Sequence, residues 1–195
     1  MKLYKIMDRR EALRISALLM GGSLSAATIT GVLNGCKAST SPDWTPAFVP
    51  KELANSLAEL CETIIPAGKT PGAKDAKVER FIDVMMKEVF KPEDQETFTK
   101  GLKQLDSDAR SKYGKAFDKI KPEERVEMVK AMDDELRERK EQPASKPFYD
   151  LVKELTVTGY CTSEPGATQH LKYVAVPGDY KPCIPLSEVG GTWAI

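Results

Sequence analysis

The chain has 195 residues, of which 41% are hydrophobic, and its 29 basic side chains balance its 29 acidic ones. This size and composition suit one globular domain with some additional chain. The balanced charge excludes the basic excess of nucleic-acid-binding proteins, so we expect no nucleic-acid partner.

The N-terminal segment has the features of an export signal. The paired arginines Arg9 and Arg10 precede an uncharged, mildly apolar run over residues 15–33 that contains several Gly, Ser and Thr residues. This arrangement is typical of a twin-arginine signal, which directs already folded proteins to export. We therefore expect Arg9 and Arg10 to act as the export signal.

The end of this run indicates lipidation at Cys36. The sequence Leu33-Asn34-Gly35-Cys36 resembles a bacterial lipobox, in which the cysteine becomes the lipidated first residue of the mature chain. An uncleaved transmembrane anchor is the alternative, because the run approaches the roughly 20 apolar residues that span a bilayer. Residues 1–35 are thus predicted to be a twin-arginine-type lipoprotein signal peptide. Acyl chains on Cys36 would hold the exported protein at a membrane, facing the periplasm or the cell exterior.

Residues 36–50 are predicted to be a tether. Ser, Thr, Pro and Asp predominate in its first half, whereas Trp44, Phe48 and Val49 make its second half apolar. We expect this aromatic half to pack against the domain that follows.

Residues 51–195 are predicted to form that domain, and the periodicity of its first hundred residues is helical. Apolar residues recur at three- and four-residue spacing, and no stretch alternates with period two as a half-buried strand would. The expected helices run over about residues 50–65, 78–89, 92–114, 122–136 and 148–155. Proline residues at the starts and Gly114 at one end fit these boundaries. The predicted fold is all-α, a bundle of about five helices preceded by the signal segment.

The C-terminal segment after the last predicted helix is rich in Gly and Pro and has no clear periodicity. Turn-forming residues begin at Gly159 and recur at Pro165, Pro177 and Pro185. Such a segment has too little periodic apolar surface to fold alone. We therefore expect an irregular wrap that lies on the preceding helices or on a partner chain.

The sequence lacks the motifs of common redox sites. It has no Gly-x-Gly-x-x-Gly for a dinucleotide and no Cys-x-x-Cys-His for a covalent haem. The single histidine, His170, follows Ala167 by three residues, so the Glu-x-x-His spacing of di-iron bundles is absent. We expect His170 to be a polar residue of the wrap, with a catalytic base as the alternative.

The methionines are a further possibility for a metal site. Copper binding is the alternative to their use as flexible core filler, which we expect for Met85, Met86, Met128 and Met132. We predict no catalytic, cofactor-binding or metal-binding residue in this chain.

Two groups of residues make the chain recognisable. The first comprises Glu62-Thr63-Ile64-Ile65-Pro66, Thr70-Pro71-Gly72-Ala73 and Phe81-Ile82-Asp83. The second comprises Phe148-Tyr149-Asp150-Leu151, Gly159-Tyr160 with Thr162-Ser163-Glu164, Gly166-Ala167, Leu171-Lys172-Tyr173 and Val176-Pro177-Gly178. Together they make residues 53–193 resemble the small-subunit (subunit 3) family of the membrane-bound gluconate 2-dehydrogenases.

The resemblance implies an accessory role. Members of this family accompany a large flavin-dependent dehydrogenase of the glucose-methanol-choline type, often with a cytochrome c subunit, that oxidises a sugar, sugar acid or polyol outside the cytoplasm. FAD is then expected in the partner and no cofactor in this chain. We expect a non-catalytic subunit that binds the dehydrogenase, escorts it through export and anchors it to the membrane. A free-standing exported lipoprotein with an unrelated partner is the alternative, and a chain that itself catalyses an oxidation is the third.

The cysteines remaining after Cys36 also carry expectations. Cys161 stands where the family commonly has an aromatic residue, and Cys61 lies in the apolar stripe of the first helix. We predict a Cys61–Cys161 disulfide, with two buried free thiols as the alternative. Cys183 stands near prolines in the tail and is predicted to contact a partner, as are Tyr160, Tyr173, Tyr180 and Trp193.

Overall fold

The computed structural model describes residues 44–139, 146–176, 178–179 and 183–194, all within one compact unit formed by residues 41–195. The predicted signal residues Arg9 and Arg10 and the lipidation site Cys36 lie outside the described residues. So does Tyr180, one of the tail residues predicted to contact a partner.

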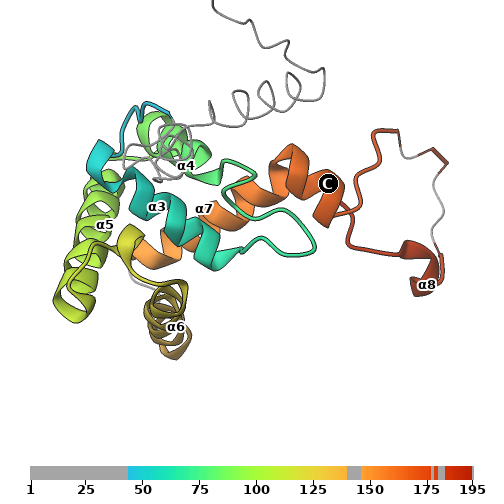
Figure 1. Ribbon diagram of the computed structural model, residues 1–195. Coiled ribbons are helices and arrows are strands. Elements are labelled where there is room, and N and C mark those ends of the chain that lie inside the picture. The colour runs from blue at the N-terminus through green and yellow to red at the C-terminus, as the bar shows by residue number, and fades with distance from the viewer. Residues whose placement is uncertain (1–43, 140–145, 177, 180–182, 195) are drawn as a thin grey trace, which may run out of the picture. The chain divides into compact units, whose positions relative to one another are not determined.

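The described part of the chain is all-α, as the periodicity predicts (Figure 1). Its long helices are α3 (Lys51–Ile64), α4 (Val78–Glu88), α5 (Pro92–Tyr113), α6 (Pro122–Glu138) and α7 (Phe148–Thr162). Three short turns of helix complete it, namely η1 (Phe117–Lys119), η2 (Gly166–His170) and α8 (Leu186–Val189). The five predicted helices are therefore confirmed. Within the described residues, extended pairing is limited to an isolated bridge between Lys172 and Trp193.

The ends of the helices follow from proline and glycine. Pro92 and Pro122 occupy the first turns of α5 and α6, where the missing N–H group would have no partner within the helix. Gly114 ends α5 with a φ of 73°, in the left-handed region that a residue without Cβ adopts without strain.

The core is built around α3 and α7, each of which packs against all the other long helices. The two helices lie side by side at the centre of Figure 1. Their fully buried apolar side chains include Leu57 and Leu60 from α3 and Val152 from α7. Ile82, Phe98 and Leu102 complete this layer from α4 and α5. Among the described residues, no helix is both long and apolar enough to cross a membrane.

The segment before α3 packs on the bundle, as its aromatic residues predict. Trp44 and Phe48 are partly buried against the core and Val49 is buried. Phe48 lies 6.2 Å from the ring of Phe98, and Phe98 lies 5.8 Å from Phe148 at the start of α7. A chain of aromatic contacts thus joins three segments that are distant in sequence.

The last long helix extends beyond its predicted end. Helix α7 continues through Gly159 to Thr162, although the sequence predicted turns from Gly159 onward. Glycine is used here for close packing rather than for a turn, because a Cβ at position 159 would lie 2.5 Å from Cδ1 of Phe81. The absent side chain lets α4 approach α7.

The C-terminal segment was expected to be irregular and to lie on the preceding helices or on a partner chain, and its described residues are not buried against the helices. After Gly166, none of the described side chains is buried. Too few apolar residues occur there in a periodic arrangement for the segment to bury a face against the helices. Its apolar side chains therefore stay in contact with solvent in this chain.

Candidate functional site

The two groups of recognisable residues meet in space, although they are distant in sequence. The hydroxyl of Tyr160, near the end of α7, donates a hydrogen bond of 2.7 Å to the carbonyl oxygen of Pro71. Figure 1 shows the loop that joins α3 to α4 beside this end of α7. The C-terminal segment leaves the bundle from the same end, through η2, which packs against α7.

Glu62 organises the loop that receives Tyr160. Its carboxylate accepts hydrogen bonds of 2.9 Å from the backbone N–H groups of Ala67 and Lys74. Gly72 is required beside it, because a Cβ there would lie 2.5 Å from Oε1 of Glu62 and 2.6 Å from the nitrogen of Ala67. These contacts explain why glutamate and glycine belong to the first group of recognisable residues.

Asp83 has a similar role for the segment that enters α3. Its buried carboxylate accepts hydrogen bonds from the backbone N–H groups of Ala47, Phe48 and Val49 at 2.7, 3.0 and 2.7 Å. The three donors give the buried carboxylate hydrogen-bond partners from one continuous stretch of backbone. Asp83 therefore holds the segment before α3 against α4.

One of the comparisons with known proteins identifies a family. The profile of the family described as gluconate 2-dehydrogenase subunit 3 matches residues 51–178, well over half of the chain. The chain belongs to the gluconate 2-dehydrogenase subunit 3 family. No curated protein and no solved structure matches it. As a member of this family, it is a subunit that associates with other subunits of a dehydrogenase complex.

The segment after η2 of this family member closes on itself. The backbone N–H of Lys172 donates to the carbonyl oxygen of Thr192 at 2.7 Å, and the N–H of Ala194 donates to the carbonyl oxygen of Lys172 at 3.1 Å. The ammonium group of Lys172 also lies over the ring of Trp193 and donates a hydrogen bond to the carbonyl oxygen of Val189, at the end of α8. We call the described residues of the range 172–193, whose two ends are joined by these contacts, the C-terminal loop.

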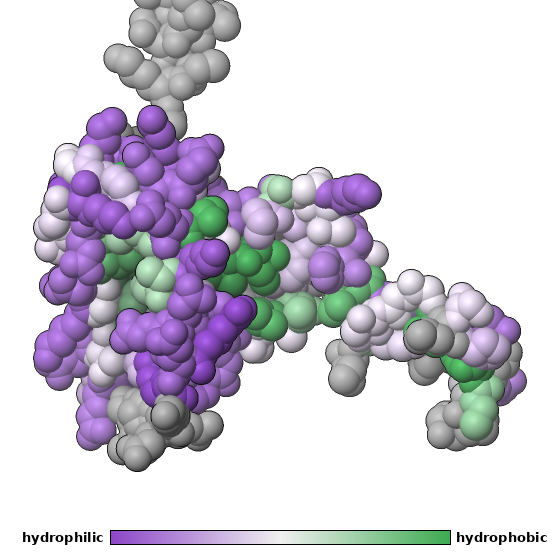
Figure 2. Space-filling view, turned by 90° about the horizontal axis from the view of Figure 1, so that it is seen from below, coloured by the Kyte–Doolittle hydropathy of each residue, from purple (hydrophilic) through white to green (hydrophobic). Residues whose placement is uncertain are grey.

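The C-terminal loop presents apolar side chains to solvent. Figure 2 shows hydrophobic surface on this segment and in a seam between the helices of the bundle, whose surface is otherwise mainly hydrophilic. The exposed apolar residues of the loop are Tyr173, Val174, Val176, Ile184 and Trp193. Val176 is 82% exposed, so the loop itself provides it almost no cover. An exposed cluster of this kind is typical of a protein–protein contact.

The residues predicted to touch a partner fall into two groups. Tyr173 and Trp193 are 54% and 43% exposed, and Cys183 is exposed as well, so all three are accessible on the C-terminal loop. Tyr160 differs, because it is only 2% exposed and its hydroxyl is bonded to Pro71. Its predicted contact with a partner is therefore wrong, and its role is internal.

The predicted disulfide is also absent. Cys61, Cys161 and Cys183 are all free thiols. The α7 residue that faces Cys61 is Thr156, whose hydroxyl lies 3.5 Å from the Cys61 sulfur. Cys161 lies five residues farther along α7, about 7.5 Å along the axis and on another face of the helix. Burial raises the pKa of Cys61 from 9.0 to about 12, so this thiol stays protonated.

His170 lies at the surface, and two of the four methionines predicted to fill the core lie in it. His170 is exposed, and its ring contacts that of Tyr160 edge to face at 5.6 Å. Met86 is fully buried and Met85 partly buried in the core, as predicted. Across the described ranges, no group of three or more His, Cys, Asp or Glu side chains is arranged to hold a metal ion.

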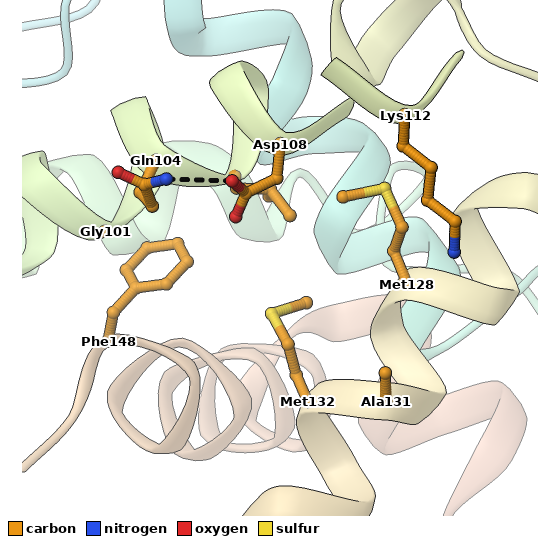
Figure 3. A pocket seen from close by; sticks show the side chains of 9 residues that line it. Gly101, Gln104, Asp108, Lys112, Met128, Ala131, Met132 and Phe148 are labelled. Carbon is orange, nitrogen blue, oxygen red and sulfur yellow. Dashed lines mark hydrogen bonds between the residues drawn. The ribbon is translucent and has the colours of Figure 1, made fainter. Parts of the chain in front are cut away.

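The other two methionines line a groove that the sequence did not predict. The groove has a volume of about 320 Å³ and lies between α5, α6 and the start of α7 (Figure 3). Met128 and Met132 face it from α6, and Phe148 forms one end. On α5, Gln104 donates a hydrogen bond of 2.8 Å to Asp108. The groove thus joins apolar walls to a polar edge.

Sequence reasoning also missed Lys172. The residue lies within the recognisable motif Leu171-Lys172-Tyr173, but no local pattern links it to Trp193. One feature of the sequence indicated a structural role for Lys172: it is a lysine between apolar residues in a segment rich in turn-forming residues.

Proposed function

We propose that this chain is a non-catalytic small subunit that binds a large flavin-dependent dehydrogenase, escorts it through export and anchors it to the membrane. The partner would hold FAD and oxidise a sugar, a sugar acid or a polyol outside the cytoplasm. A cytochrome c subunit would complete the complex and take up the electrons. The small subunit would hold no cofactor of its own.

The observation that carries this proposal is the exposed apolar surface of the C-terminal loop. Tyr173, Val176 and Trp193 are exposed in a chain that belongs to a family of dehydrogenase subunits. Aromatic and aliphatic side chains lose contact with water when a partner covers them, and this burial favours association by about 25 cal/mol per Å² before the costs of binding. A large subunit seated on the loop would bury these side chains.

The export and anchoring roles rest on the N-terminal segment. A twin-arginine signal at Arg9 and Arg10 suits a flavoprotein complex, because a flavoprotein must fold around its cofactor before it crosses the membrane. One tagged chain would then export both. Lipidation at Cys36 would hold the complex at the membrane on the exported side.

The decisive experiment is purification of the tagged full-length chain from its native membrane in mild detergent. We expect a large chain in fixed ratio, a flavin absorption band and dye-linked oxidation of a sugar, sugar acid or polyol. A variant that ends at Leu171 is expected to lose the large chain while the bundle keeps its unfolding temperature, since no described side chain after Gly166 is buried. A wild-type chain that is isolated alone, without flavin, would support the alternative of a free-standing lipoprotein.

The escort role has a separate test. Replacing Arg9→Lys together with Arg10→Lys keeps the charge but not the arginine pair, and should leave both this chain and the large chain in the cytoplasm. Lys2→Arg with Lys5→Arg is the matched control and should not affect export. Continued export of the large chain with the first variant contradicts the escort role. Cys36→Ser should release the active complex from the membrane.

A further inference from the structure

We infer that Lys172 closes the C-terminal loop into a preformed binding element for the large dehydrogenase subunit, and that this closure increases the affinity of the complex. Lys172 is thus a positioning residue, since it acts by holding Trp193 and the backbone around it. The inference rests on the proposed function, because it requires that the large subunit binds to this chain.

The closure depends on several contacts made by one residue. The Nζ atom of Lys172 lies 4.4 Å from the centroid of the Trp193 ring and donates a hydrogen bond of 2.9 Å to the carbonyl oxygen of Val189. Val189 is the last residue of α8, where the unpaired carbonyl groups favour a cation. The backbone of Lys172 also makes both hydrogen bonds of the isolated bridge, to Thr192 and Ala194. One lysine therefore fixes the two ends of the loop to each other.

The loop is held without a core of its own. After Gly166, the described side chains are at most half-buried, so apolar packing contributes little to its conformation. In the described part of the loop, the contacts of Lys172 join its two ends. Removing the lysine side chain would leave only the two backbone hydrogen bonds of Lys172 between these ends, so it should loosen the loop around Trp193 while the helical bundle remains intact.

The partner is a protein subunit rather than a membrane surface. Residues 172–193 contain two lysines and two acidic residues, so the loop has no net positive charge to attract anionic lipid. Lys172 is moreover already engaged within the loop. Exposed Tyr and Trp side chains with little charge are the composition of the centre of protein–protein interfaces.

The loop spans the end of the range that matches the family profile. The family match ends at residue 178, within the loop. Lys172 lies inside the match, whereas Trp193, which it holds, lies outside. Lys172, at a position that the profile covers, thus holds a residue beyond the matched range.

Preorganisation is the physical reason for the expected gain in affinity. A loop that is already closed loses less conformational freedom on binding than an open one, so more of the interface energy appears as affinity. The cation–π contact with Trp193 and the charged hydrogen bond to Val189 stabilise the closed loop. Their loss should weaken binding of the large subunit about tenfold.

The test measures binding of full-length variants to the large flavin-containing chain isolated from the wild-type complex. Lys172→Met keeps the aliphatic stem but removes the ammonium group, and should raise the Kd about tenfold. Lys130→Met, at an exposed lysine of α6, is the matched control and should leave the Kd unchanged. Both variants should unfold at the wild-type temperature, which separates loop opening from loss of the fold.

A second readout reports the loop without the partner. Trp44 and Trp193 are the two tryptophans of the chain, so a Trp44→Phe background leaves Trp193 as the sole indole. In that background, Lys172→Met should increase quenching of Trp193 fluorescence by acrylamide. Unchanged quenching would show that Lys172 does not close the loop, and would overturn the inference.

The remaining outcomes separate the inference from the proposed function. If Trp193→Ala weakens binding but Lys172→Met does not, the loop binds without prior closure and the inference fails while the subunit role stands. If neither variant changes the Kd, the interface lies elsewhere and the inference fails in the same way. If the loop instead binds vesicles of phosphatidylglycerol in a Trp193-dependent manner, it is a membrane contact. If the wild-type chain binds no flavoprotein, both proposals fail.

Discussion

The hydroxyl group of Tyr160 donates a hydrogen bond to the carbonyl oxygen of Pro71, a residue 89 positions earlier in the chain. This contact fixes the end of α7 to the loop between α3 and α4. The C-terminal segment leaves the bundle just beyond it, so the contact determines where that segment starts. Together with the packing of Phe81 against Gly159, it joins the two groups of recognisable residues in space.

Removal of the Tyr160 hydroxyl should therefore weaken the bundle. Tyr160→Phe keeps the buried ring but leaves the carbonyl of Pro71 without its donor, which should lower the free energy of unfolding by about 1–2 kcal/mol. Urea denaturation followed by circular dichroism measures the change. Tyr173→Phe, at an exposed tyrosine of the C-terminal loop, is the control and should have no effect on the bundle. Equal stabilities of the two variants would contradict this role of Tyr160.

Asp83 should be more important still, because three backbone N–H groups depend on its carboxylate. Asp83→Asn retains one acceptor oxygen and places an amide group against the N–H donors, so we expect a loss of about 2–3 kcal/mol in the free energy of unfolding. The emission of Trp44, which packs near this point, should shift to longer wavelength as the segment detaches. Asp134→Asn on the exposed face of α6 should change neither quantity.

Gly101 should tolerate no side chain. A Cβ at this position would lie 2.1 Å from Cγ of Phe148, which closes one end of the groove between α5 and α6. Alanine normally stabilises a helix interior by about 1 kcal/mol relative to glycine, but overpacking costs about 1–3 kcal/mol and should prevail here. Thermal unfolding of Gly101→Ala is the measurement. At Gly68 a Cβ would meet nothing within 4 Å, so Gly68→Ala is the control and should not lower the unfolding temperature, whereas an undiminished unfolding temperature for Gly101→Ala would contradict overpacking against Phe148.

The stability of the bundle should fall in alkaline solution. Burial raises the pKa of Cys61 from 9.0 in the unfolded chain to about 12, and burial beside Asp133 raises that of Tyr149 from 10.0 to about 12. Below pH 9 both groups are protonated in both states, so their full contribution is present. Between pH 9 and 12 the unfolded thiol ionises while the native one does not, which lowers the free energy of unfolding by up to about 1.4 kcal/mol per pH unit.

This pH dependence can be assigned by substitution. Cys61→Ala removes the thiol, so its free energy of unfolding should fall less steeply above pH 9 than that of the wild type, whatever the cost of the cavity at neutral pH. Urea denaturation at half-unit intervals from pH 7 to 11 measures both slopes. Parallel curves would mean that the thiol does not titrate as its burial requires.

Thiol labelling should distinguish the cysteines of the domain. Iodoacetamide at pH 8 should modify the exposed Cys183 rapidly and the buried Cys61 only after unfolding. Peptide mass spectrometry without reductant identifies each site. A Cys61–Cys161 peptide pair in this experiment would overturn the arrangement of free thiols. Protection of Cys183 in the purified complex, followed by its labelling in the separated chain, would place that residue at the interface.

The helices were predictable because their information is local. The spacing of apolar residues defines the buried face of each helix, and Pro92, Pro122 and Gly114 mark ends through their own backbone constraints. The position of the aromatic residues before α3 was predictable for the same reason. The prediction of a turn at Gly159 was wrong, because this glycine makes room for the ring of Phe81 on another helix.

The sequence predicted which segment would contact a partner, but not which of its residues are exposed. Composition alone showed that the tail cannot form a core, and the exposure of Tyr173 and Trp193 agrees with that inference. Composition could not separate these residues from Tyr160, which lies in the same stretch of sequence. Tyr160 is buried because α7 continues past Gly159, where the sequence predicted a turn.

By itself, the sequence determined the class of fold, the boundaries of most helices and membership of the family, because each depends on neighbouring residues or on motifs read in order. Only the tertiary structure decided that Tyr160 is internal, that Thr156 rather than Cys161 faces Cys61, and that Lys172 holds Trp193. These pairings join positions far apart in the chain, and their geometry follows from the packing of whole helices. No residue carries such information locally, since the partner of a side chain depends on where every other element comes to lie.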